Sequence, residues 1–299
     1  TLFPYTTLFR SPAPISPLLT WEKVTSYDLG LDFGLFGNRL VGTFDYFWRN
    51  TNNMVAPGEE LPNTAGVSSP YTNNAKMRTK GWELSVSWRD KLSNGLGYGA
   101  TLVMSDAMST ILSYPNETNN ISKYYRGRKL GEIWGYETNG LAKTDEEMKS
   151  HLASLPNGGQ NALGTNWAAG DIMYKDLNGD GKIDGGQGVL GNTGDRKVIG
   201  NETPRYNFGL TLNAEYKGFD LSAYFTGAAR TSTFFEDRTF WPFASGMGFF
   251  NVFKEIYDNR WTPETAGAAK YPVVTDGFNV QSMRRSTVWQ KDASYLRLK

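Results

Sequence analysis

The feature that most constrains the fold of this chain is a strict alternation of apolar and polar residues, repeated in several short segments. In residues 25–36, TSYDLGLDFGLF, the apolar positions fall at every second residue: Tyr27, Leu29, Leu31, Phe33 and Leu35. Aspartates and glycines occupy the positions between them. A period of two is that of a β-strand, in which successive side chains point to opposite faces. The sequence therefore predicts strands with one apolar and one polar face.

These segments come in pairs that read as hairpins. Short turns, FGNR, KLSNG and KG, join 25–36 to 40–48, 81–90 to 96–105, and 205–216 to 219–227, and ASYLRLK at 293–299 begins a seventh strand. The connections between hairpins are long, at about 51–78, 107–204 and 229–292. Short turns at one end, long loops at the other and aromatic residues at the strand ends are typical of outer-membrane barrels and unusual for soluble sandwiches. We therefore predict an all-β fold, part of a large antiparallel transmembrane β-barrel.

Composition narrows the function classes. Lys and Arg (31) nearly balance Asp and Glu (30), so a nucleic-acid partner is not expected. The sequence has no Cys, which excludes disulfides, zinc ribbons and thiol nucleophiles. A histidine-dependent triad would have to use His151, the only His, which lies in a polar segment where a solvated side chain is expected. Acidic pairs such as Asp145 and Glu146 sit at a helix start rather than in a cleft, so we predict that the chain is not an enzyme.

The two ends of the chain look unlike natural termini. Residues 1–11, TLFPYTTLFRS, resemble the in-frame translation of a short-read sequencing adapter and are expected to be a non-native artefact, the alternative being a genuine strand. Residues 12–23 are an ill-defined lead-in, and 24–299 are assigned to the barrel. Because the last residues stop inside an alternating pattern, the chain is expected to be a fragment.

Two segments of the long connections predict short helices. TDEEMKSHLASLP has a capping box, with Thr144 at the N-cap and Glu147 three residues later. FFNVFKEIYDNRW, residues 249–261, carries an apolar stripe at helical spacing that is expected to pack in a loop core.

DLNGDGKID, residues 176–184, is the segment that most resembles a metal site. Its spacing follows the start of an EF-hand loop, but Gln187 stands where a bidentate Glu is needed and the flanks are rich in glycine rather than helical. Two interpretations remain open. One is a structural calcium site made by Asp176, Asn178, Asp180, Lys182 (through its carbonyl), Asp184 and Asp195. The other is a metal-free turn held by Asx hydrogen bonds.

Aromatic residues in the loops are candidates for cargo contact, because sugar rings stack on Trp and Tyr. The candidates are Trp134, Tyr136, Trp167 and Trp241. Most loop aromatics are instead expected to pack in loop cores.

Several motifs in order resemble the C-terminal barrel region of the SusC/RagA family of TonB-linked outer-membrane transporters. They are GEIWGYETNGLAKTDEE, DIMYKDLNGDGKID, DRKVIGNETPRYNFGLTLNAEYKGFDLSAYFTGAA, NRWTPETAGAAKYP and KDASYLRLK, and the resemblance covers roughly residues 20–299.

The resemblance implies a 22-stranded barrel in the bacterial outer membrane, of which this chain supplies about six strands. It implies import of oligosaccharides or peptides with a SusD-type surface lipoprotein, and coupling to TonB through an N-terminal region that this chain lacks. No cofactor is required, apart from the structural calcium considered above. The alternative function is a secreted or surface β-rich glycan-binding protein with a calcium-binding loop.

Overall fold

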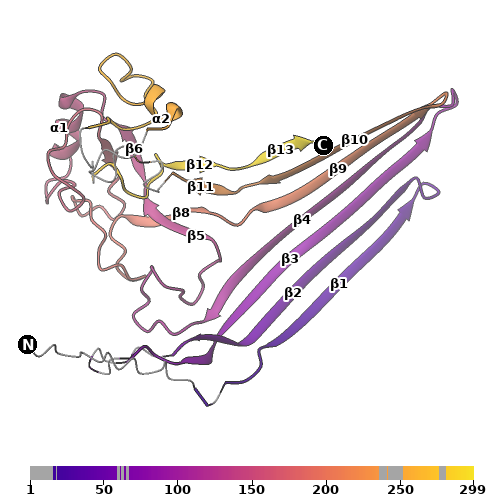
Figure 1. Ribbon diagram of the computed structural model, residues 1–299, viewed down its shortest axis with the longest axis horizontal. Helices are drawn as coiled ribbons and strands as arrows, with labels where there is room; N and C mark the ends of the chain where they lie inside the picture. The colour runs from indigo at the N-terminus through magenta and orange to yellow at the C-terminus, as the bar shows by residue number, and fades with distance from the viewer. Residues whose placement is uncertain are drawn as a thin grey trace, which may run out of the picture.

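The computed structural model of the chain describes residues 16–17, 19–58, 61, 64, 67–235, 241, 252–275 and 281–299. Residues 1–11 and part of the lead-in 12–23 therefore lie outside the described residues. Its main element is a seven-stranded antiparallel sheet (Figure 1), in the order β1 (Lys23–Leu35), β2 (Leu40–Pro57), β3 (Tyr71–Lys91), β4 (Gly97–Ser113), β9 (Arg205–Tyr216), β10 (Phe219–Ala229) and β13 (Tyr295–Leu298). The all-β fold, the three hairpins and the seventh strand are confirmed.

The three tight hairpin turns lie at one end of the sheet and the long connections at the other (Figure 1). The first two connections are shorter than predicted. β2 and β3 continue along residues 51–57 and 71–78, so the predicted loop 51–78 spans only 58–70, and the loop predicted from residue 107 starts after β4 ends at Ser113. The sequence does not reveal these strand ends because they are polar and lack the apolar alternation. They still pair, for example Thr51 with Met77, since strand pairing needs only backbone hydrogen bonds.

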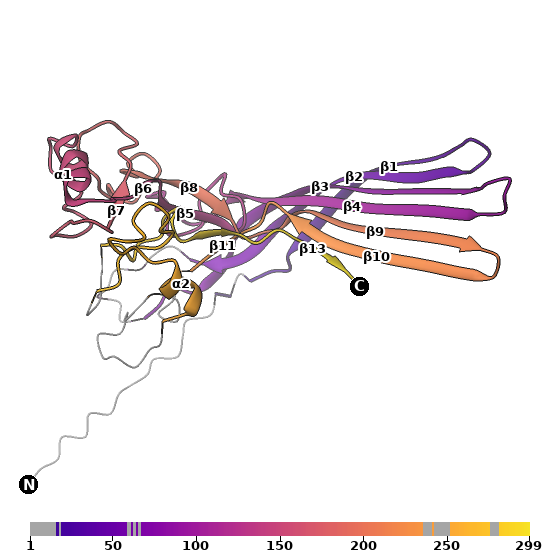
Figure 2. The same ribbon diagram turned by 90° about the horizontal axis from the view of Figure 1, so that it is seen from above.

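The register aligns the apolar residues of neighbouring strands into one continuous face. Leu31 lies opposite Phe44, Phe44 opposite Leu84, and the row continues through Met104 to Phe208. Leu31 is 61% exposed and Leu221 on β10 is 70% exposed. Among the described elements, these strands pack on their neighbours in the sheet rather than on a second layer (Figure 2). A soluble sandwich would bury this face, whereas a membrane barrel presents it to lipid.

Aromatic residues border the apolar face at both ends. Tyr27 stacks on Trp48 with ring centroids 5.0 Å apart at the loop end, and Phe36 contacts Trp88 at 6.2 Å at the turn end. The strand from Tyr27 to Leu35 is about 27 Å long, close to the roughly 25 Å apolar band of outer-membrane barrels. The two borders thus have the spacing of interfacial girdles.

The buried cores of the chain lie in the loops rather than in the sheet. Small two-stranded sheets organise them: β5 (Glu132–Tyr136) with β8 (Arg196–Asn201), β6 (Thr138–Leu141) with β7 (Ile172–Tyr174), and β11 (Ser232–Phe234) with β12 (Gln290–Asp292). The largest apolar cluster surrounds Tyr136, Ile172 and Tyr174. Since water-facing loops need their own cores, this distribution fits a sheet whose apolar face meets lipid.

The first predicted helix is confirmed. α1 (Asp145–Ala153) begins after Thr144, whose hydroxyl accepts the Glu147 amide at 3.2 Å, while the Glu147 carboxylate accepts the amide of Lys143 at 2.6 Å. α2 (Lys254–Asp258) is shorter than the apolar stripe predicts, and Phe249 lies outside the described residues. Within the part of the chain that the structure describes, none of the helices has the length and apolar character to cross a membrane.

Candidate functional site

The sheet separates two chemical environments. One face is the apolar band, and the other carries small and polar side chains, with Asp45 opposite Glu83 and Thr101 opposite Thr211. Serine and threonine link neighbouring strands on this face, for example Ser87 to Thr101 at 2.6 Å. A sheet with one apolar side and one polar side has the two-faced character of a membrane-barrel wall.

The two longest connections meet above this wall. The amide of Tyr136 donates to the carbonyl of Arg285 at 2.9 Å, and the amide of Thr287 donates to the carbonyl of Tyr136 at 3.1 Å. The hydroxyls of Thr138 and Thr287 are 2.8 Å apart. Residues as far as 149 positions apart thus form one loop assembly, which contains every sequence-predicted site residue.

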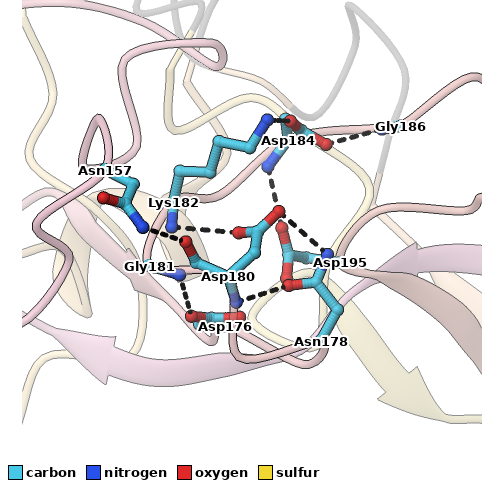
Figure 3. Close-up of polar contacts among 9 residues, drawn as sticks. All are labelled: Asn157, Asp176, Asn178, Asp180, Gly181, Lys182, Asp184, Gly186 and Asp195. Carbon is cyan, nitrogen blue, oxygen red and sulfur yellow. Dashed lines mark hydrogen bonds and ion pairs between the residues drawn. The ribbon is translucent and has the colours of Figure 1, made fainter.

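The Asp-rich loop is held by hydrogen bonds from side chains to nearby backbone amides (Figure 3). Asp176 accepts the amides of Gly179 at 2.6 Å and Gly181 at 2.9 Å. Asn178 accepts the amide of Asp180 at 2.9 Å, and Asp180 accepts the amide of Lys182 at 3.1 Å. The φ angles of Gly179 (75°) and Gly181 (78°) lie in the left-handed region, which explains glycine at both places.

Asp195 joins the two ends of this loop. Its carboxylate accepts the amide of Leu177 at 2.8 Å through one oxygen and the amide of Asp184 at 2.8 Å through the other. The side chain is fully buried, and burial raises the pKa of its carboxyl above the ordinary value. Asp195 therefore lies at the Asp-rich loop as an acceptor of backbone amides. Its predicted role as a calcium ligand stays a prediction.

The remaining predicted ligands do not converge on one point. The Asp184 carboxylate accepts the amide of Gly186 at 2.7 Å and lies 2.8 Å from the Lys182 ammonium group, and both contacts lower its pKa. Among the described residues, no three His, Cys, Asp or Glu side chains are grouped as a metal site. In this arrangement the carboxylates accept hydrogen bonds from backbone amides. The calcium site stays a prediction.

The four predicted cargo aromatics are mainly parts of the loop cores. Tyr136 is buried against Tyr174, with centroids 5.4 Å apart, and half-buried Trp167 contacts the same ring at 6.1 Å. Trp241 is half-buried against Trp289 at 6.4 Å. Trp134 is half-buried, and its indole N–H donates to the Tyr125 hydroxyl at 3.1 Å. The Tyr125 hydroxyl in turn donates to the Glu132 carboxylate at 2.8 Å. Burial and this hydrogen bond raise the pKa of Tyr125 to about 12.

A cavity of about 370 Å³ between the two connections was not predicted from the sequence. We call it the arginine cavity, and it is lined by Ile121, Ser122, Arg128, Trp134, Gly135, Tyr136, Arg196, Arg284 and Arg285. Its arginines are spread over more than half of the chain, so no local spacing signals them. The backbone bonds between Tyr136 and residues 285–287 bring them together.

An ion pair fixes the base of the loop assembly to the wall. The Arg205 guanidinium donates to both carboxylate oxygens of Asp106. Asp106 lies on β4 opposite Trp82, and Arg205 is the first residue of β9. A two-pronged pair of this kind has a defined geometry as well as charge attraction.

The sequence matches the family described as "TonB dependent receptor-like, beta-barrel" over residues 4–253. It is 26% identical over 295 residues to TonB-dependent receptor P3 of Formosa agariphila, covering 94% of this chain and 27% of that receptor. It is 25% identical over 219 residues to TonB-dependent receptor SusC of Bacteroides thetaiotaomicron, covering 71% of this chain and 20% of that receptor. The chain thus spans about a quarter of the length of these relatives.

Solved structures share the fold. The chain superposes on one from the RagAB peptide importer in its "open-open" state with a TM-score of 0.63 and 22% identity, covering 94% of this chain and 28% of that chain. The "closed-closed" state gives a TM-score of 0.62 at the same identity, covering 94% of this chain and 28% of that chain.

Proposed function

This chain belongs to the β-barrel family of TonB-dependent receptors, which are outer-membrane transport proteins and not enzymes, and we propose that it forms part of the wall and outer loops of an importer for oligosaccharides or peptides. The observation that carries the proposal is the continuous apolar face across seven paired strands, with all long loops at one end. That face calls for a lipid environment, and the opposite face offers a polar path. The alternative, a soluble glycan-binding protein, would require a cover over Leu31 and Leu221.

The proposed partners are a SusD-type surface lipoprotein and TonB. The lipoprotein would cover the loop end, where the loop assembly presents preformed, packed surfaces rather than loose segments. TonB would act through a region of the transporter outside this chain. Support for both partners comes from the similarity to SusC and to the RagAB fold.

Uptake by the intact transporter tests the proposal. Cells that express it together with the neighbouring surface lipoprotein should accumulate labelled oligosaccharide or peptide, and deletion of TonB should abolish accumulation. A tagged transporter extracted in detergent should co-purify with the lipoprotein. Recovery of the protein in the soluble fraction, or accumulation that persists without TonB, would contradict the proposed function.

The loop assembly offers a neutral control substitution for the uptake assay. Replacing exposed Lys149 on α1 by Gln should change neither insertion nor uptake, because its side chain lies outside the cores. Loss of uptake in that control would indicate that the assay reports expression rather than transport.

A further inference from the structure

We propose that the arginine cavity binds an anionic saccharide, with a sulfate or carboxylate group on its guanidinium groups and a sugar ring against Trp134. The inference rests on the proposed import function, since the cavity lies in the loop assembly through which cargo would enter. It adds a chemical class of cargo, negatively charged glycans, to that function.

The first argument is an excess of arginine over acidic residues in the cavity lining. Among the described residues that line the cavity, four are arginines and none is Asp or Glu. The Arg196 guanidinium donates to the carbonyl of Gly185 at 2.5 Å, and that of Arg284 donates to the carbonyl of Leu163 at 3.0 Å. Arg128 likewise donates to the carbonyl of Ile121 at 3.0 Å. Carbonyls orient a guanidinium group without neutralising it, so the cavity wall keeps a positive potential that attracts anions.

The nearest carboxylates are already engaged elsewhere. Asp184 and Asp195 lie close enough to influence Tyr136 electrostatically. The Asp184 carboxylate pairs with Lys182 at 2.8 Å, and the Asp195 carboxylate accepts two backbone amides. Neither is hydrogen-bonded to Arg196 or Arg284 among the described residues, although charge attraction to Arg196 contributes to the lowered pKa of Asp184. One such acid beside four arginines leaves the cavity with an excess of positive charge.

The second argument is a pair of unsatisfied donors. The Nε–H groups of Arg196 and Arg284 are buried and have no hydrogen-bond acceptor among the described residues. A buried donor without an acceptor is destabilising, so an acceptor that reached these groups would stabilise the protein. Because both Nε–H groups are closed to solvent in this conformation, the arginine side chains would have to shift to reach a bound anion. Planar guanidinium groups favour the paired oxygens of sulfate and carboxylate groups.

The third argument favours a saccharide over an acidic peptide. Trp134 is half-buried and lines the cavity, which provides an aromatic surface for the apolar side of a sugar ring. An extended peptide would in addition need main-chain partners. The backbone of β5 is already paired with β8 and bonded to residues 285–287. The volume of about 370 Å³ lies in the lower part of the range for ligand sites, about 300–1,000 Å³.

Calorimetric titration of the intact transporter in detergent tests the inference. The probes are a chondroitin sulfate tetrasaccharide, which carries sulfate and carboxylate groups, neutral cellotetraose and a tetraglutamate peptide. We expect the sulfated probe to bind at least about tenfold more tightly than the neutral one, with affinity that falls as salt rises. The double substitution Arg196→Gln and Arg284→Gln should remove most of this preference.

The matched control is Arg126→Gln, because Arg126 is exposed on the same connection and does not line the cavity. It should leave binding of the sulfated probe unchanged. Co-purification with the lipoprotein reports whether the double variant is folded. If the double variant does not fold, the relative affinities of the three probes for the unaltered protein still test the inference. Equal binding of charged and neutral saccharides, or tighter binding of tetraglutamate, would overturn the inference. TonB-dependent uptake of another cargo would then still support the proposed function.

Discussion

Placing a charge on the lipid face of the sheet should destabilise the transporter far more than placing the same charge one residue away. Leu102 lies on the apolar face, four residues from Tyr98 and four from Asp106, with Val86 and Leu210 as its cross-strand neighbours. Its position is therefore about 14 Å along the strand from either limit of the band, near the bilayer midplane. Adjacent Val103 points to the opposite face and is 45% exposed.

The expected cost of Leu102→Arg is about 2–4 kcal/mol, because an arginine near the midplane of a barrel must leave water. This corresponds to a loss of about 30- to 900-fold in the folding equilibrium constant. Val103→Arg should cost less than about 1 kcal/mol, since its side chain extends into the wet interior. Both changes replace one apolar residue by Arg, so composition alone predicts equal effects.

The assay is urea-dependent unfolding of the intact transporter in lipid vesicles, followed by tryptophan fluorescence and by the heat-dependent gel mobility of the folded barrel. The midpoint should fall for Leu102→Arg and stay near that of the unaltered protein for Val103→Arg. Equal destabilisation by the two substitutions, or a larger effect at Val103, would refute the assignment of the faces.

Three further predictions concern the loops and their attachment. Arg205→Ala should lower the free energy of unfolding by about 1–3 kcal/mol, because it leaves the mostly buried Asp106 carboxylate without its ion-pair partner. Arg39→Ala, which breaks an exposed pair with Asp90, should lower it by less than about 1 kcal/mol in the same assay. Burial lowers the pKa of His151, so its stabilising contribution is complete above the unfolded value near 6.5 and is lost as pH falls through the folded value. The protection of α1 amides, which is their exchange rate relative to the intrinsic rate at the same pH, should therefore fall at pH 5, and His151→Gln should remove this response. Asp176→Ala should increase proteolysis within residues 170–200 with or without calcium, and calcium protection that this substitution abolishes would instead establish the metal site.

The wall was predictable because its signal is local. Alternation over a few residues places Leu29, Leu31 and Phe44 on one face, and the tight turns set the register of each hairpin. The ends of β2 and β3 were misplaced because the ladder continues outside the apolar band, where Thr51 pairs with Met77 and Met54 with Ala75 and no alternation is needed. The alternation of apolar and polar residues therefore marks the limits of the apolar face better than it marks the ends of the strands.

The loop assembly was only partly predictable, because its contacts join distant segments. The capping box of α1 and the Asx bonds of the Asp-rich loop involve residues within five positions of each other, so spacing alone indicates them. The arginine cavity depends on the pairing of Tyr136 with Arg285 and Thr287, which no local pattern encodes. His151 was expected to be solvated, but it is half-buried with its ring 3.2 Å from the side-chain amide oxygen of Gln160, since α1 packs on the loop core.

The wall and the loop assembly stabilise each other through chain closure. The connection between β4 and β9 is roughly 90 residues long, and bringing the ends of such a loop together costs about 4 kcal/mol of entropy. Pairing of β4 with β9 along residues 97–105, together with the Asp106–Arg205 ion pair, offsets this cost and closes the connection at the loop end of the sheet. The apolar face of the same strands requires lipid. Insertion into the membrane should therefore order the extracellular loops, since the pairing that closes them belongs to strands that are stable only there.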